Sequence, residues 1–329
     1  MANDKTDVRY WIGFDLGGTK MLAVVFDDDF KEIGKARKKT RGHEGVDAGL
    51  KRINDVIAKA LDDADVKAEQ VKGLGIGCPG PLDLKKRQIR EAPNLGWKDV
   101  PIAESIEQKF KFPVTIANDV DAGVFGEYQS GAGKKARCLV GIFPGTGIGG
   151  GCVYEGKLLR GANCTAMEIG HMPMVLQGPV DGLGNEGSLE SVASRLAIAG
   201  AAAQAAYRGQ APHLLKETGT DIADIRSGAL SGSVKNGDKM VEQIIHNACV
   251  HLANSVVTVV HLLAPDVVVF GGGLIEAMED TMLPKIEKLA RARILPSMRD
   301  VYKIEAAKLG DDAGVLGAAA LARQSVLEK

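Results

Sequence analysis

The chain has 329 residues, of which 45% are hydrophobic and 25% are charged, as is typical of a soluble globular protein with a large core. Its 41 basic and 42 acidic side chains leave a formal charge of -1, which argues against a general nucleic-acid binder. Five scattered cysteines without a CxxC pair argue against a disulfide framework and favour the reducing cytoplasm. The N-terminal segment lacks a signal-peptide pattern, and no apolar run approaches the roughly 18 residues of a membrane span.

The first half of the chain alternates apolar runs typical of strands with segments of helical spacing. We expect strands at residues 10–14, 21–26, 71–77 and 114–117. We expect helices at residues 49–61 and 102–110. The first two strands flank a Gly-Gly turn, which indicates a hairpin, and the alternation of strands and helices predicts an α/β fold.

The second half contains a similar hairpin, with strands at 138–143 and from 152 to 154 around a Gly-rich turn at 144–151. The two Gly-rich turns lie 130 residues apart, counted from Gly17 to Gly147, which indicates an internal repeat with one related α/β unit in each half. Further elements are expected as helices at 191–207, 239–263 and 314–327 and a strand at 267–270. The 41 glycines follow no collagen period and predict many tight loops.

Three Gly-rich turns follow strand-like runs, at residues 15–20, 145–149 and 271–273. Turns of this kind let backbone N–H groups converge on an anion without a Cβ in the way. None is a Walker A loop, and each alone is typical of an ordinary hairpin or strand end, but all three in this order predict a nucleotide site. In the first turn Thr19 and Lys20 could add donors, and Asp15 could hold Mg²⁺ through water.

Polar residues at strand ends and in loops offer candidates for the reacting groups. Asp119, after the strand at 114–117, could take a proton from a hydroxyl that attacks a phosphoryl group. The pair Asn118-Asp119 is also typical of an Asx turn or a helix N-cap. Glu168 and His171 could face one ligand from a helix or tight turn, although such pairs are more often found on surfaces.

Seven segments, taken in chain order, resemble the ROK family of sugar kinases, repressors and related proteins, within the actin/hexokinase-like ATPase fold. They are DLGGTK at 15–20, GCPG at 77–80, NLGW at 94–97, ND at 118–119, GTGIGGG at 145–151, EIGH at 168–171 and GGG at 271–273. The resemblance extends from about Trp11 to the final helix. It implies two related ribonuclease H-like α/β domains with an active-site cleft between them. The first would be residues 1–125, completed by a C-terminal helix at about 312–329, and the second residues 126–311.

The resemblance also implies the role of individual residues. Residues implied for Mg–ATP are Asp15, Gly17, Gly18, Thr19, Lys20, Thr146, Gly147, Gly271, Gly272 and Gly273. Asp119 is the implied catalytic base on the sugar hydroxyl. Residues implied for sugar binding are Asn94, Asn118, Asp119, Glu168, His171 and Glu190. Carboxylates and amides of this kind suit a sugar because its hydroxyls need acceptors and donors in fixed directions.

The chain departs from the family pattern at one loop. Many ROK proteins hold a structural zinc with the His of the EIGH segment and three Cys of a CxCGxxGCxE loop. Here Asp181, Leu183 and Ser188 stand at the cysteine positions, and since Leu cannot ligate zinc and Ser is a poor ligand, we expect no structural zinc. Fourteen residues precede Asp15, too few for the helix-turn-helix of ROK repressors, so we expect a kinase.

These features predict an ATP-dependent sugar kinase that converts glucose to glucose 6-phosphate, in carbohydrate metabolism and the cytoplasm. Two alternatives stay open. One is a kinase for another sugar, such as N-acetylmannosamine, mannose, fructose or allose, or one that uses polyphosphate instead of ATP. The other is a sugar-binding regulator without catalysis. We expect small-molecule partners, no nucleic acid and no membrane, and the resemblance implies a homodimer or homotetramer.

Overall fold

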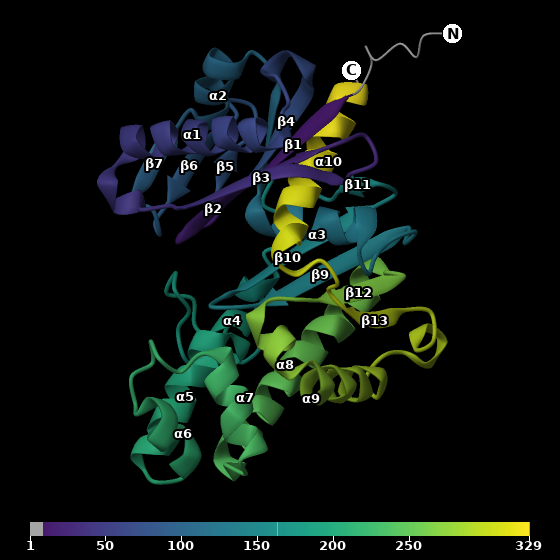
Figure 1. Cartoon of the computed structure of the whole chain (residues 1–329). Helices are drawn as coiled ribbons and strands as arrows, with labels where there is room; N and C mark the ends of the chain where they lie inside the picture. Colours follow the sequence, from purple (N-terminus) through teal and green to yellow (C-terminus); the bar gives the residue numbers. More distant parts are fainter. Residues whose placement is uncertain (1–8, 163, 329) are drawn as a thin grey trace. The chain divides into compact units, whose positions relative to one another are not determined.

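The computed structural model describes residues 9–162 and 164–328 (Figure 1). These residues form two compact units. The first contains the chain up to Lys134, the short segment Arg160–Thr165 and the chain from Asp311 onward. The second contains Lys135–Leu159 and Ala166–Gly310. The domain bounds expected from the sequence, 1–125 with 312–329 and 126–311, stay a prediction, and residues 1–8 and 329 lie outside the described part.

The first unit is built on a five-stranded sheet with the strand order β3-β2-β1-β4-β8. Its strands are β1 (Tyr10–Leu16), β2 (Lys20–Phe26), β3 (Glu32–Lys39), β4 (Val71–Cys78) and β8 (Val114–Asn118). The first three strands pair antiparallel, which confirms the first hairpin, and β1, β4 and β8 run parallel. A small sheet contains β5 (Leu82–Asp83), β6 (Gln88–Ala92) and β7 (Trp97–Val100).

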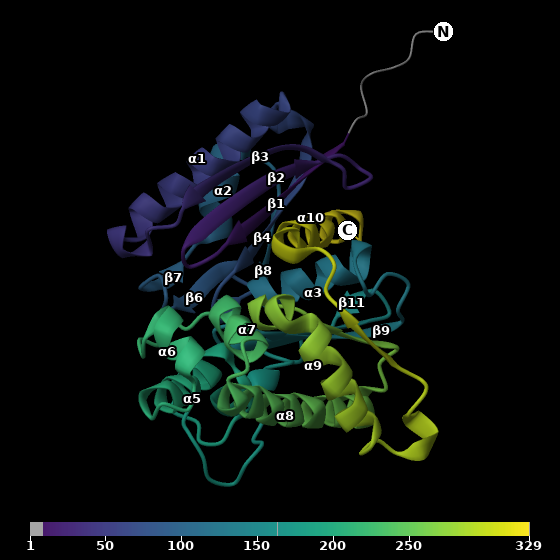
Figure 2. The same cartoon turned by 60° about the horizontal axis from the view of Figure 1, so that its bottom comes forward.

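Helices cover both faces of this sheet (Figure 2). They are α1 (Val46–Ala64), α2 (Ile102–Phe110), α3 (Asp119–Ser130) and α10 (Ala313–Leu327), with short 3-10 turns at Gly42–Glu44, Ala68–Gln70 and Gly310–Asp312. Successive side chains of a strand point to opposite faces. Ile12 and Phe14 therefore pack with the buried face of α1, while Trp11 packs with Val315 of α10.

Glycines let α10 and α3 approach their neighbours more closely than any other residue would. The four positions are Gly13 on β1, Gly75 on β4, Gly126 on α3 and Gly317 on α10. A Cβ at any of them would lie between 1.7 and 2.2 Å from a backbone oxygen of the facing element. The sequence analysis assigned the abundant glycine to tight loops, but these four lie inside regular elements, where a side chain has no room.

The second unit repeats the same sheet plan, with the strand order β11-β10-β9-β12-β13. Its strands are β9 (Cys138–Pro144), β10 (Ile148–Tyr154), β11 (Lys157–Leu158), β12 (Val267–Phe270) and β13 (Lys303–Ala306). Here too the first three neighbours pair antiparallel and the last three run parallel. The internal repeat expected from the two hairpins is confirmed at the level of sheet topology.

The helices of the second unit are mostly short, apart from two long ones. They are α4 (Leu189–Ala193), α5 (Arg195–Tyr207), α6 (Pro212–Thr218), α7 (Ser227–Lys235), α8 (Lys239–Leu263) and α9 (Gly273–Arg291), with 3-10 turns at Ile169–His171 and Pro296–Met298. Apolar residues of α5, α8 and α9 form one core cluster with the sheet.

Two expected boundaries in this unit are wrong. The helix predicted at 191–207 is interrupted because Ser194 ends α4 and caps α5, where its Oγ accepts a hydrogen bond from the Ala197 N–H at 3.2 Å. The Gly-rich turn predicted at 144–151 is shorter, since Ile148 already pairs with Pro144 at the start of β10. Its glycines from Gly149 to Gly151 therefore lie in a strand.

Helix α8 is the one described helix that is long and apolar enough to cross a membrane, judged by length and composition. The sequence analysis saw no such segment. Half of this stretch is buried in the protein, and residues such as Leu252 and Val256 belong to the core cluster of the second unit. A core helix meets the same criteria, so the helix is explained by packing.

Candidate functional site

The first Gly-rich turn, between β1 and β2, is held by a buried threonine that the sequence analysis did not select. The Gly17 N–H donates to the Lys20 carbonyl at 3.0 Å. Thr40, fully buried, donates from Oγ1 to the Gly17 carbonyl at 2.6 Å and from its backbone N–H to the Thr19 carbonyl at 2.9 Å. Gly18 and Thr19 at the tip are exposed, so this turn can offer donors to an anion.

Asn94 lies directly against this turn. A Cβ at Gly18 would lie 2.9 Å from the Asn94 Nδ2 atom, so only glycine leaves the exposed amide in place. The structure thus brings a residue predicted for the sugar beside a residue predicted for the phosphates.

Asp15 is held near the carboxyl end of β1, where Gly77 of β4 pairs with it and also with Ala117 of β8. Asp119 follows β8 at the same edge of the sheet. Burial, and next the negative charge of Asp119, raise the pKa of Asp15 to about 6, against the opposing effect of Lys20. Carboxyl ends of parallel strands are the usual place for ligands in open α/β sheets. The two carboxylates predicted for magnesium and for base catalysis are therefore neighbours.

Lys20 forms an ion pair with Asp311, a residue that the sequence analysis did not select. The Asp311 side chain is 66% exposed and the Lys20 side chain 44%, so the pair is open to solvent. Hydrogen bonding and charge from Lys20 lower the pKa of Asp311 despite some desolvation. A phosphate that bound Lys20 would compete with this carboxylate.

Asn118 and Asp119 stand where β8 passes into α3. The Asn118 Oδ1 atom accepts hydrogen bonds from the Val120 N–H at 2.9 Å and the Asp121 N–H at 3.3 Å, so Asn118 is the N-cap of α3. The helix N-cap that the sequence analysis gave as an alternative for this pair is thus confirmed for Asn118. Its amide nitrogen keeps the donor capacity that sugar binding needs. One Asp119 oxygen accepts from the Val120 N–H at 3.0 Å, which fixes the carboxylate at the start of the helix.

The second Gly-rich turn, between β9 and β10, is held by Glu190. The Glu190 Oε2 atom accepts a hydrogen bond from the Ile148 N–H at 2.8 Å, and a Cβ at Gly147 would lie only 2.2 Å from the same oxygen. Arg195 donates from its backbone N–H to the Gly145 carbonyl at 2.9 Å and from Nη2 to the Thr146 hydroxyl at 3.0 Å. A residue predicted for the sugar and two predicted for phosphates therefore lie together.

Glu168 precedes the 3-10 turn Ile169–His171, and His171 is the last residue of that turn. The His171 N–H donates to the Glu168 carbonyl at 3.1 Å. The Glu168 side chain is exposed and that of His171 is 28% exposed. The His171 Nδ1 atom lies 2.9 Å from the buried Asp181 carboxylate. The tight turn expected for this pair is confirmed.

The third glycine run forms the start of α9. Gly272 has a φ of 80°, in the left-handed region that favours glycine, and precedes the first helical residue, Gly273. A Cβ at Gly271 would lie 2.5 Å from the Phe143 ring. Gly273 is thus exposed and Gly271 is buried. The three glycines therefore could not contact a ligand equally, and the exposed part is the N-terminus of α9.

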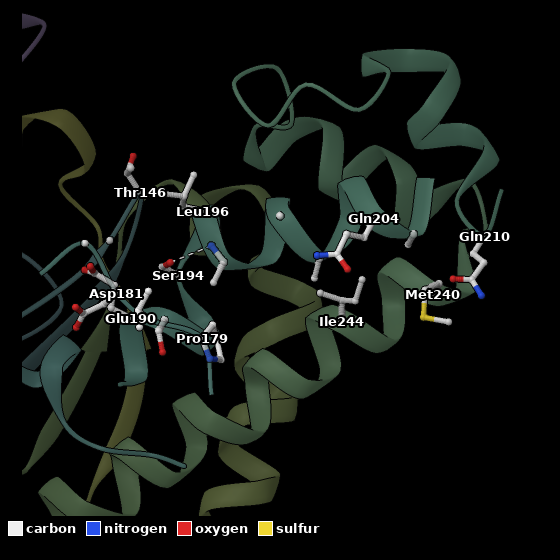
Figure 3. Close-up of a pocket in the computed structure, with 18 of the residues that line it drawn as sticks. Thr146, Pro179, Asp181, Glu190, Ser194, Leu196, Gln204, Gln210, Met240 and Ile244 are labelled. Atoms are coloured by element: carbon white, nitrogen blue, oxygen red, sulfur yellow. Dashed lines mark hydrogen bonds between the residues drawn. The ribbon is translucent and has the colours of Figure 1, made fainter. Parts of the chain in front are cut away.

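A cavity of about 900 Å³ lies within the second unit (Figure 3). Figure 3 shows Thr146, Asp181 and Glu190 at one end and Gln210 and Met240 at the other, with α5 along its length. The lining includes Thr146, Gly147 and Glu190 from the predicted site. Glu168 and His171, although described in the structure, do not line this cavity.

The candidate site residues differ in whether they suit Mg²⁺ or zinc. In the part of the chain that the structure describes, no group of three or more His, Cys, Asp or Glu side chains could hold a metal by itself. A single carboxylate such as Asp15 suits Mg²⁺, which keeps several waters and takes further oxygens from substrate phosphates. The residues beside His171 make a poor zinc site, because the Leu183 side chain offers no ligand atom and Ser188 is a poor zinc ligand.

Comparisons with known proteins identify the family and the fold of this chain. The chain matches the ROK family over residues 11–325. It is 32% identical to a glucokinase of Thermotoga maritima over 96% of this chain and 98% of that protein. A crystal structure of a ROK family glucokinase from Streptomyces griseus, in complex with glucose and AMPPNP, is 31% identical, with a TM-score of 0.80 over 96% of this chain and 99% of that one. A xylose repressor of Caldicellulosiruptor bescii is 28% identical over 98% of this chain and 80% of its own length.

Proposed function

Since the chain belongs to the ROK family, we propose that it is an ATP-dependent sugar kinase that converts glucose to glucose 6-phosphate. Its α/β fold is the actin/hexokinase-like ATPase fold. The single observation that carries the mechanism is the pair of carboxylates, Asp15 and Asp119, at one edge of the first sheet. One carboxylate can serve the metal-bound phosphates and the other the attacking hydroxyl.

Asp119 is the proposed catalytic base. It accepts the proton of the sugar hydroxyl while the hydroxyl oxygen attacks the γ-phosphorus of ATP. A new bond joins this oxygen to phosphorus, the bond between the γ-phosphorus and the bridging oxygen breaks, and ADP leaves. The N-cap geometry of α3 holds the carboxylate in place, so little reorganisation is needed at the moment of transfer.

The Gly-rich turns are proposed to bind the nucleotide. The exposed turn at Gly17, Gly18 and Thr19 and the second turn at Thr146 and Gly147 would hold the phosphates through backbone and hydroxyl donors. The glycine run Gly271, Gly272 and Gly273 would bind the adenosine, and Lys20 would exchange Asp311 for phosphate oxygens. Asp15 would hold Mg²⁺, which when bound neutralises charge on the phosphates.

The sugar would be bound by the residues that the sequence predicts. They are Asn94, Asn118, Glu168, His171 and Glu190, together with the base Asp119. Two of them touch phosphate turns, Asn94 beside Gly18 and Glu190 beside Gly147. These contacts support the proposal because the acceptor hydroxyl and the γ-phosphate must lie next to each other. Cytoplasmic location, a place in glycolysis and a homodimer or homotetramer stay predictions.

Two alternatives remain in the proposal. The 181–190 loop, which lacks the cysteines of zinc-binding relatives, gives a reason to test other sugars and polyphosphate. A sugar-binding regulator is favoured by the similarity to the xylose repressor, but this chain keeps Asp119 and both phosphate turns.

The proposal is tested by a coupled assay of ADP release from Mg–ATP with a panel of hexoses and amino sugars. We expect turnover with glucose well above the sugar-free control. Turnover on another sugar would correct only the substrate. Sugar-dependent thermal stabilisation without any turnover would favour the regulator instead.

A further inference from the structure

The Asp181 carboxylate is fully buried and receives five hydrogen bonds from four residues. Its Oδ1 atom accepts from the backbone N–H groups of Leu183 and Asn185, both at 2.9 Å. Its Oδ2 atom accepts from the Asn185 amide at 3.3 Å and the Ser188 hydroxyl at 2.9 Å, and lies 2.9 Å from the His171 Nδ1 atom. One side chain thus joins the 181–188 loop to the turn that carries His171.

The direction of each hydrogen bond in this cluster is fixed. Backbone N–H groups can only donate, and the Ser188 Oγ atom already accepts from the Ser191 N–H at 3.3 Å, so its own proton is available to Asp181. Burial raises the pKa of Asp181, but the hydrogen bonds from His171, Asn185, Ser188 and Leu183 outweigh it and hold the pKa well below its usual range. An ionised carboxylate only accepts, and therefore the Nδ1 atom of His171 must carry a proton.

The same cluster reaches the second phosphate turn. Ser188 is the N-cap of α4, and Glu190 lies in the first turn of that helix. Glu190 in turn accepts the Ile148 N–H beside Gly147. The Asp181 hydrogen bond to Ser188 therefore sets the position of the helix start from which Glu190 extends.

We infer that Asp181 is a positioning residue of the sugar site, which holds His171 with its Nδ1 protonated and its Nε2 presented to a sugar hydroxyl. This inference rests on the proposed function, in which His171 binds the sugar. Asp181 acts through His171 and does not touch the reacting atoms. The carboxylate also holds the loop, so the loop needs no metal ion. For metal-ligating histidines, removing the partner that orients the ring typically costs about 10- to 100-fold in metal affinity or activity, and we expect a loss of the same order for the sugar.

The decisive variant is Asp181→Asn, which keeps the shape but turns one oxygen into a donor. The remaining oxygen can still accept from the backbone N–H groups of Leu183 and Asn185. The new amide nitrogen then faces three donors, which belong to His171, Ser188 and the Asn185 side chain. We expect His171 to change to the Nε2-protonated form. We expect the KM for the sugar to rise about 10- to 100-fold.

Ser188→Ala is the matched control, because it removes a donor to the same oxygen but leaves His171 bonded to Asp181. We expect it to lower the melting temperature without changing the proton position on His171. Nitrogen-15 spectra of histidine-labelled protein report this position directly, with His171→Gln used to assign the signal. EDTA should leave the melting temperature of the wild type unchanged.

Three results would overturn the inference. The first is a wild-type His171 that is protonated on Nε2 and not on Nδ1, a result that needs no variant to fold. The second is an Asp181→Asn protein that loses stability as Ser188→Ala does and keeps its sugar KM. The third is a loss of stability with EDTA. The spectra do not depend on turnover, so failure of the kinase assay alone would contradict the proposed function and not the role of Asp181.

Discussion

At the scale of single residues, the environment of Asp15 disfavours the charged form of its carboxyl group. Its folded pKa of about 6 lies above the ordinary value of 3.8, because burial and Asp119 disfavour its charge. The protonated carboxyl therefore contributes stability that is fully present below about pH 4 and is lost as the pH rises through about 6.

The variant Asp15→Asn should remove the free-energy cost of holding an ionised Asp15 in the folded protein. Its free energy of unfolding should exceed that of the wild type by about 2–3 kcal/mol at pH 8, since each pKa unit corresponds to 1.36 kcal/mol. The gain should nearly vanish at about pH 3, where the carboxyl is mostly protonated in both the folded and the unfolded state. Urea titrations at the two pH values measure it, and an equal gain at both would contradict the raised pKa. The same variant should lose kinase activity.

Gly147 provides a second residue-scale test, because its missing side chain leaves room for Glu190. A methyl group 2.2 Å from the Glu190 Oε2 atom must displace the carboxylate or the turn. We expect Gly147→Ala to lower kcat/KM about 10- to 100-fold with little loss of stability. Gly228→Ala on α7, whose Cβ would meet no atom within 4 Å, is the control and should keep full activity. Normal kinetics for Gly147→Ala would rule out this geometry.

Sequence alone suggested candidate site residues more readily than the residues that hold them in place. Asp15, Asn94, Asp119 and Glu190 stand in recognisable segments, and their neighbours follow from the strand order. Thr40 donates hydrogen bonds to the Gly17 and Thr19 carbonyls of the first turn. It lies 21 residues beyond Thr19, and no sequence motif marks it. A hydrogen bond between distant segments leaves no periodicity in the sequence, so such supporting residues could not be predicted.

At the scale of elements, the close contact of α10 with α3 makes the C-terminal helix part of the first unit's core. A Cβ at Gly317 would lie 1.7 Å from the Ala122 carbonyl oxygen. We therefore expect Gly317→Ala to lower the free energy of unfolding by about 3 kcal/mol or more, since overpacking commonly costs 1–3 kcal/mol even where the clash is with side chains.

The control is Gly123→Ala on the facing helix, where a Cβ would meet nothing within 4 Å. This substitution should be neutral or should stabilise the protein by about 0.5–1 kcal/mol, because alanine is the better helix former. Denaturant titrations of the two variants should therefore show opposite signs. Equal effects would show that the two helices are not packed through Gly317.

Some elements with a strongly apolar run or a helical spacing were predicted with their bounds, and the strands of the small sheet were not. The helices α2 and α8 and the strand β12 have the bounds that the sequence predicts. The small sheet of β5 to β7, however, has strands of two to five residues, too short for an alternating pattern to stand out. The break at Ser194 depends on one capping hydrogen bond, which competes with a helical pattern that continues on both sides.

At the scale of the whole molecule, the two units share one sheet plan, and the sequence signal for this repeat is the pair of hairpins with Gly-rich turns. That plan was predictable because each hairpin has an unusual glycine-rich turn. The helices added after β10 in the second unit were harder to predict, since they vary in length and carry the 181–190 loop. The specificity for a sugar would depend on that loop, so the sequence leaves several sugars open as the acceptor.

The proposed role of Asp119 is tested most directly by kinetics of Asp119→Asn beside Asp121→Asn. Both variants remove one negative charge from the first turn of α3, so they share any effect on the helix. We predict that Asp119→Asn lowers kcat for glucose phosphorylation about 10²- to 10⁴-fold while the protein stays folded and binds sugar, and that Asp121→Asn retains most activity. Near-normal turnover by a stable Asp119→Asn protein would contradict the proposed mechanism.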